Sequence, residues 1–108
     1  MTTRRAALLI VAMLICCACA PAMMLSAPPN APSDVVAGCE IANHRCSHCH
    51  TLERIKLARV SDAVQWQWYV ARMRLMPRSG ISEPDQRAIV RCLVARSFGN
   101  DAVEGLDK

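Results

Sequence analysis

Aromatic residues are scarce in this chain of 108 residues, which has only four: Trp66, Trp68, Tyr69 and Phe98. A core built from these side chains would be thin, and small domains of this kind usually gain stability from a disulfide, a metal or another bound group. No run of lysine and arginine follows the N-terminal Arg4-Arg5 pair, which argues against a nucleic-acid-binding module. No stretch alternates apolar and polar residues for the length of a strand. We therefore expect an all-α domain folded around something besides its own side chains.

The apolar content, 53% overall, is concentrated at the N-terminus. Nineteen of the twenty residues 6–25 are apolar, two arginines precede them, and Ala18-Cys19-Ala20 is a small-x-small cleavage candidate. This layout is typical of a secretory signal, and we assign residues 1–25 to it. An uncleaved membrane anchor and a lipid on Cys19 are alternatives. All three predict an exported, periplasmic domain, either free or tethered to the inner membrane.

Two polar segments flank the domain expected over residues 33–98. Residues 26–32 contain three prolines in seven residues, which is typical of an extended linker. Residues 99–108 are polar and acidic, and we predict a flexible, frayed end there.

Helical periodicity predicts three helices within this domain. The first begins at Ser33, whose hydroxyl is a suitable cap, and carries apolar residues at three- and four-residue steps. A short stretch around residues 51–60 separates it from the second, which begins near Asp62 and stops at Pro77. The third begins at Ser82 in a sequence that resembles a capping box, with a proline in its first turn, and runs to Ser97.

Residues 46–50 (CSHCH) form a C-x-x-C-H motif, the attachment signature of c-type haem. Thiols three residues apart on a helical turn point the same way and can each join a vinyl group, and the next imidazole then lies beneath the iron. A redox-active C-x-x-C pair would require a strand before the motif, and a zinc site lacks a well-spaced second pair. We expect one covalent haem c on Cys46 and Cys49, with His50 as axial ligand.

Further segments accompany this motif: residues 46–54 (CSHCHTLER), Trp66-x-x-x-Val70-x-Arg72-Met73, residues 80–82 (GIS) and Ile89-x-x-Cys92-Leu93. Together they resemble the small single-haem class I cytochromes c, in particular a compact subgroup with a W-x-x-x-V-x-R-M helix. The likeness covers about residues 35 to 96. It implies a fold in which the first and last helices cross near the haem, with a histidine and a methionine on opposite faces of the iron.

Two methionines compete for the second axial position. Met73 occupies the R-M position of the family, and the resemblance therefore implies Met73 as the ligand. Met76, followed by Pro77, resembles the Met-Pro pair of many larger class I cytochromes and is the alternative. Histidine ligation and an open site are further alternatives. A thioether ligand stabilises ferrous iron, and the other methionine is expected to pack against the ring.

Three arginines are candidates for contacts with the haem propionates, because a guanidinium group matches a carboxylate: Arg54, Arg72 and Arg74. Each also fits an ordinary solvated helix position. We expect His44 and His48 to face solvent and Trp66 to pack against the haem.

Cys39 and Cys92 are the remaining cysteines after residue 25. If the first and last helices cross as the resemblance implies, Gly38 permits their close approach, and Cys92 stands where the family usually has an aromatic residue. The two thiols would then face each other in an oxidising compartment and form a disulfide. The alternative is two buried thiols that pack as small apolar residues.

An iron with both axial positions filled has no place for a substrate, so the resemblance implies one-electron exchange. No catalytic base, nucleophile constellation or phosphate-binding loop is visible, and we expect an electron carrier without a small-molecule substrate rather than an enzyme. Residues 45–96 contain ten basic and four acidic residues, which favours an acidic redox partner protein. Two alternatives are a haem subunit of a multi-component dehydrogenase or reaction-centre complex, and a haem sensor with a displaceable methionine.

Overall fold

The computed structural model of the chain describes residues 23–107, and the regular elements among them are all helical: α2 (Ser33–Cys46), α3 (Glu53–Lys56), α4 (Ala63–Arg74), α5 (Glu83–Phe98) and the 3₁₀ helix η1 (Asn100–Asp107). The all-α prediction is confirmed. The predicted leader lies outside the described residues except for positions 23–25. Within the described part of the chain, no helix is both long and apolar enough to cross a membrane.

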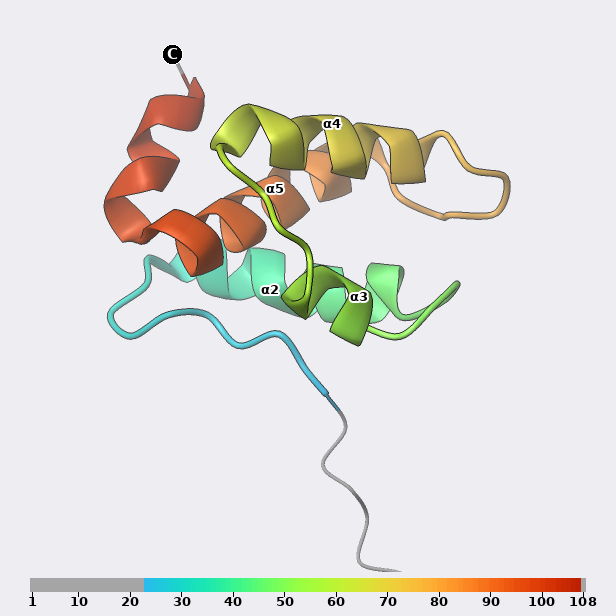
Figure 1. The fold of residues 1–108 in the computed structure, drawn as a ribbon, viewed down its shortest axis with the longest axis horizontal. Coiled ribbons are helices and arrows are strands. Elements are labelled where there is room, and N and C mark those ends of the chain that lie inside the picture. The colour runs from blue at the N-terminus through green and yellow to red at the C-terminus, as the bar shows by residue number, and fades with distance from the viewer. Residues whose placement is uncertain (1–22, 108) are drawn as a thin grey trace, which may run out of the picture.

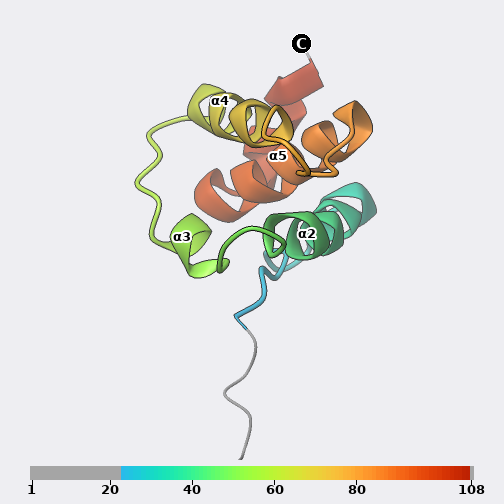
Figure 2. The same ribbon diagram turned by 90° about the vertical axis from the view of Figure 1, so that its right-hand side faces the viewer.

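Helix α5 is the central element of the fold. It packs against α2 on one side and against α4 on the other, and η1 folds back onto it (Figures 1 and 2). The short α3 lies in the same layer as α2 (Figure 2). The buried side chains between these helices are mainly aliphatic, with one aromatic: Val35, Ala42, Trp66, Val70, Ile89, Leu93 and Val94.

The predicted starts of α4 and α5 are confirmed by their caps. The Asp62 carboxylate accepts a hydrogen bond from the backbone N–H of Gln65 at 2.9 Å. At the start of α5, the Ser82 hydroxyl accepts from the N–H of Asp85 at 3.1 Å, and the Asp85 carboxylate accepts from the N–H of Ser82 at 3.2 Å. This reciprocal pair satisfies two backbone donors that the helix itself leaves without partners.

The start of α2 differs from the prediction. Pro32 rather than Ser33 holds the cap position, and no side chain caps the helix. The carbonyl of Pro32 instead accepts from the N–H of Val36 at 3.1 Å, so Ser33 is the first helical residue. Helix α3 was not predicted, because a single turn is too short to show periodicity.

The segment before α2 belongs to the folded domain. Leu25, which the sequence places in the leader, is only 2% exposed and lies in the core. Its N–H donates to Oδ1 of Asn43 at 2.7 Å, and its carbonyl accepts from Nδ2 of Asn43 at 2.9 Å. Arg96 donates to the carbonyl of Ser26. Residues 26–32 are irregular, as a Pro-rich linker is expected to be, but they are bound to the domain, since Nδ2 of Asn100 also donates to the carbonyl of Pro29 at 3.1 Å.

The flexible, frayed end predicted over residues 99–108 differs from the structure, in which residues 100–107 form η1 and pack against the core. Gly99 adopts a positive φ of 94°, which favours glycine, and the chain turns back there after α5. Val103 is then 2% exposed, and Ala102 and Leu106 pack against the core. Val103 and Leu106 are three residues apart, so they share one side of η1 despite the acidic residues around them.

Helices α2 and α5 approach each other closely at Gly38. A Cβ atom at this position would lie 2.2 Å from the backbone oxygen of Ala88, so the crossing requires glycine. Beside it, Cys39 and Cys92 form a disulfide with an S–S distance of 2.03 Å and Cα atoms 5.0 Å apart. The disulfide expected between these residues is thus formed in the structure.

Candidate functional site

The C-x-x-C-H motif lies where α2 ends and the chain turns toward α3. Cys46 is the last residue of α2, and the turn that follows is held by a hydrogen bond from the N–H of His48 to the carbonyl of Arg45 at 3.4 Å. Cys46 is buried and Cys49 is exposed. Both thiols are free, in contrast to the disulfide-bonded pair at the helix crossing.

The environment of Cys46 argues against a redox-active C-x-x-C pair. Burial, and secondarily the nearby Cys49 thiol, raises the pKa of Cys46 to about 11. Thiols that exchange disulfides have lowered pKa values, because the thiolate is the reactive form. The described residues also contain no group of three or more His, Cys, Asp and Glu side chains placed to hold a metal ion. The described residues at this turn therefore give no support to thiol exchange or to a bare zinc site.

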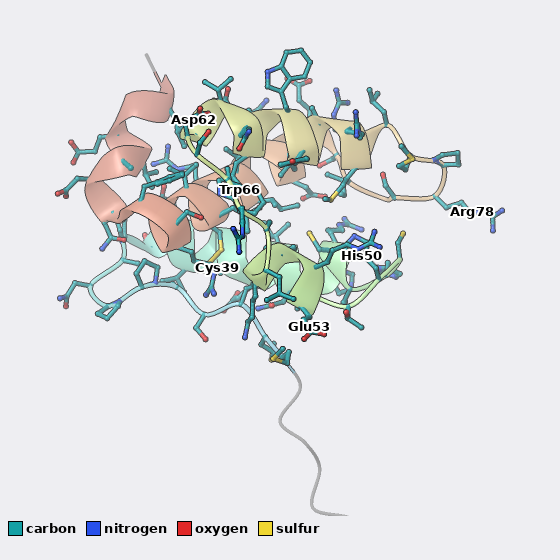
Figure 3. All side chains as sticks on the ribbon, in the orientation of Figure 1. Cys39, His50, Glu53, Asp62, Trp66 and Arg78 are labelled. Carbon is teal, nitrogen blue, oxygen red and sulfur yellow. A yellow bond between two sulfur atoms is a disulfide. The ribbon has the colours of Figure 1, made fainter. Side chains whose placement is uncertain are left out.

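His50 is partly buried, and its Nδ1 lies 3.1 Å from the carbonyl oxygen of Thr51. In the tautomer that donates from Nδ1, the Nε2 lone pair is left available to a metal. Histidine ligands commonly use their other nitrogen in this way, which fixes the ring orientation. Figure 3 shows His50 between the layer of α2 and α3 and the layer of α4. His44 and His48 are exposed, as expected.

A cavity of about 90 Å³ joins this turn to the end of α4. The cavity brings together the proposed ligands from the C-x-x-C-H motif and the two candidate methionines. Its lining residues are Arg45, Cys46, Cys49, His50, Met73, Met76, Ser79 and Ile81. The motif and both candidate methionines thus share one site. Its volume is below the roughly 300–1,000 Å³ typical of pockets that hold drug-sized ligands.

The two methionines differ in how firmly they are held. Met73 is partly buried within α4, one turn after the buried Val70. Met76 is 52% exposed in the turn that follows the helix, where its N–H donates to the carbonyl of Met73 at 3.1 Å. Both thioethers line the cavity, so both alternatives remain open.

None of the three predicted propionate arginines lines this cavity. Arg54 and Arg72 are exposed, and Nε of Arg74 donates to Oε1 of Gln86 at 2.5 Å. The cation at the cavity is Arg45, whose Nε lies 3.0 Å from Oδ2 of Asp85. The only sequence signal for Arg45 is its position before Cys46. Because basic residues are common in the last turn of a helix, this position does not identify it as a site residue.

A second hollow, of about 330 Å³, lies between α3, α4 and α5. Trp66 and Leu93 contribute to its wall, together with three cationic side chains that the sequence did not single out: Lys56, Arg59 and Arg96. Trp66 is buried, and its indole N–H donates to the Ser97 hydroxyl at 2.9 Å. Among the residues that the structure describes, no carboxylate lines this hollow, so the charged groups that an acidic ligand would meet there are all positive.

The chemistry of the first cavity fits a covalently bound haem. It offers two free thiols three residues apart, an imidazole with an available nitrogen and thioethers from a second helix. The thiols would hold the group, and His50 with Met73 or Met76 would supply axial donors. A scan against protein-family models, a search of curated proteins and a search of solved structures each found no match to the chain.

Proposed function

We propose that the chain is a periplasmic one-electron carrier, a monohaem c-type cytochrome with a histidine and a methionine on the iron. The observation that carries the proposal is the shared cavity. It places the free thiols of Cys46 and Cys49 and the His50 imidazole against Met73 and Met76, which come from α4 and the turn after it. A haem would supply a change of one electron at its iron, and the chain would supply attachment and axial donors.

The thiols attach the group and the imidazole is oriented to bind it. Cys46 is fixed by the core at the end of α2, and Cys49 reaches the same side after one turn. The Thr51 carbonyl accepts from Nδ1 of His50 and keeps Nε2 available. Because each thiol is consumed in a thioether, the raised pKa of Cys46 does not hinder the finished protein.

Met73 is the proposed second axial donor, with Met76 as the alternative. A sulfur on a helix anchored by Trp66 and Val70 is held in place without further ordering of the chain. Met76 lies in a more exposed turn and would lose more conformational freedom on binding. Filling both axial positions closes the iron to substrates and leaves electron exchange as its reaction.

Covalent attachment gives the test. The full chain is expressed with a c-type haem maturation system, and the product is stained for haem after denaturing electrophoresis. We expect haem on the wild type and none on the Cys46→Ser/Cys49→Ser variant. The matched control is Cys39→Ser/Cys92→Ser, which also removes two cysteines and should retain haem. Haem on the first variant, or none on the wild type, would contradict the proposal.

A further inference from the structure

The outer side of α4 carries large apolar side chains that the fold does not cover. The inner side of this helix is buried through Trp66 and Val70, whereas Trp68 and Leu75 are each 74% exposed. Six residues of α4 and of the turn after it line a hollow of about 570 Å³ and are called the α4 face below: Trp68, Tyr69, Ala71, Arg72, Leu75 and Met76. Exposed apolar groups gathered in this way commonly mark an interaction site.

The α4 face is continuous with the proposed haem site. Met76 lines both the 570 Å³ hollow and the cavity that contains the two thiols. Met73, the proposed axial donor, lies on the same helix. A molecule seated on the α4 face would therefore be close to the redox centre, as efficient electron transfer requires.

The surroundings of the α4 face are positively charged. No acidic residue occurs between Asp62 and Glu83, while three arginines do. The Arg74 side chain is held by Gln86, but the side chains of Arg72 and Arg78 make no hydrogen bond or ion pair with any residue that the structure describes. Arg78 projects from the loop after α4, away from the rest of the molecule (Figure 3).

We propose that the α4 face docks an acidic redox protein, with an apolar contact in the hollow and carboxylates opposite Arg72 and Arg78. Tryptophan, tyrosine, methionine and arginine are the residue types enriched in protein interfaces. A second copy of the chain would bring the same arginines together, which disfavours a symmetric dimer. This inference rests on the proposed haem function.

The test is the rate of electron transfer to a protein probe of known charge. Reduced holoprotein is mixed in a stopped-flow instrument with the oxidised form of an acidic blue-copper protein, so that one electron passes from the haem iron to the copper. We expect a second-order rate constant that falls with added salt. Trp68→Ala should lower it roughly tenfold, since a central tryptophan is a frequent hot spot. Arg72→Gln/Arg78→Gln should weaken its salt dependence.

Two controls separate docking from changes at the haem. Hexacyanoferrate(III), a small oxidant that needs no hollow, should oxidise Trp68→Ala as fast as the wild type. Arg87→Gln removes an exposed cation from α5, outside the α4 face, and should leave the rate with the copper protein unchanged within about twofold.

Four results would overturn the docking proposal. They are equal rates for wild type and Trp68→Ala with the copper protein, a rate independent of salt, Trp68-dependent sedimentation with phosphatidylglycerol vesicles, and a dimer in analytical ultracentrifugation that Trp68→Ala dissociates. A chain without haem would overturn the proposed function as well. A normal haem spectrum with unchanged rates would overturn the docking alone.

Discussion

At the scale of single residues, the four described cysteines differ in what surrounds them. Cys39 and Cys92 meet at the packed crossing of two helices, where each thiol has the other as its nearest chemical partner. Cys46 and Cys49 lie at a helix end, three residues apart, and remain free beside an imidazole and two thioethers. Position in the fold therefore separates a structural pair from a pair available for attachment.

One prediction at this scale is that Met73, rather than Met76, supplies the sulfur that binds the iron. In the holoprotein, Met73→Leu should abolish the sulfur-to-iron absorption and lower the reduction potential, because a thioether stabilises ferrous iron. Met76→Leu is the matched control, since it removes a thioether from the same cavity, and it should leave both properties near wild type. Absorption spectroscopy with redox titration measures both. If Met76→Leu causes the loss instead, the assignment is wrong.

A second residue-scale prediction concerns acid stability. Hydrogen bonding from the Ser82 backbone, and then the Arg45 guanidinium, lowers the pKa of Asp85 below its ordinary value. Between the folded-state pKa and the ordinary pKa of Asp85, the unfolded chain therefore binds more protons than the folded chain. The stabilisation is complete above about pH 4 and is lost as the pH falls through the lower, folded-state pKa.

Asp85→Asn should therefore lower the free energy of unfolding at neutral pH and flatten its decline below about pH 4, as measured by urea unfolding at a series of pH values. Glu83→Gln is the control, because Glu83 lies in the same helical turn with a side chain that is 71% exposed. A decline below pH 4 as steep in Asp85→Asn as in the wild type would show that Asp85 does not account for it.

At the scale of the elements, the contact between α2 and α5 depends on one absent side chain. Gly38→Ala would place a methyl group 2.2 Å from the backbone oxygen of Ala88, and a helix backbone cannot yield as a flexible side chain can. We expect a loss of about 3 kcal/mol in the free energy of unfolding, at the upper end of typical overpacking costs. Urea unfolding measures it.

Gly105→Ala is the matched control for this prediction, since an added Cβ there meets nothing within 4 Å. It should change stability by less than about 1 kcal/mol. Equal effects of the two substitutions would mean that helix propensity, rather than the close crossing, determines the cost at position 38.

Elements with strong local signals could be predicted from the sequence, and those that depend on tertiary contacts could not. The starts of α4 and α5 could be predicted from Asp62 and Ser82, because these side chains cap the helices directly. Helix η1 is short and acidic, and only packing of Val103 onto the core shows that it is ordered. Leu25 continues the N-terminal apolar run, so the sequence places it in the leader. Its hydrogen bonds to Asn43 join positions 18 residues apart, and a local pattern does not reveal such contacts.

At the scale of the whole molecule, the Cys39–Cys92 disulfide closes a loop that runs from the middle of α2 to the middle of α5. The bridged residues are 53 apart, and the chain-entropy estimate for a loop of this length is about 4 kcal/mol, with measured values often lower. We expect Cys39→Ala/Cys92→Ala to lose up to this amount in urea unfolding of the holoprotein. Peptide mapping without reduction should recover the two cysteine-containing peptides as one linked species. Separate peptides with free thiols would contradict the bridge.

The site could be predicted in part, because some of its residues form a local motif and others are brought together only by the fold. The C-x-x-C-H motif is local, so residues 46–50 could be identified without a fold, and the likeness to small cytochromes supplied Met73 and Met76. Arg45 was not singled out from the sequence, because only the packed structure shows that it lines the cavity and that Arg74 is held by Gln86. The α4 face was missed, since its aromatic residues resemble core residues in sequence.

The central claim, that one covalent haem is bound at the site between α2 and α4, is tested most directly by the absorption spectrum of the exported holoprotein before and after reduction. The account predicts the sharp bands of a low-spin c-type haem on reduction, unchanged by carbon monoxide because both axial positions are filled. A protein without such bands would contradict the claim entirely. Bands that shift with carbon monoxide would contradict the methionine-ligated carrier and favour an iron with a displaceable ligand.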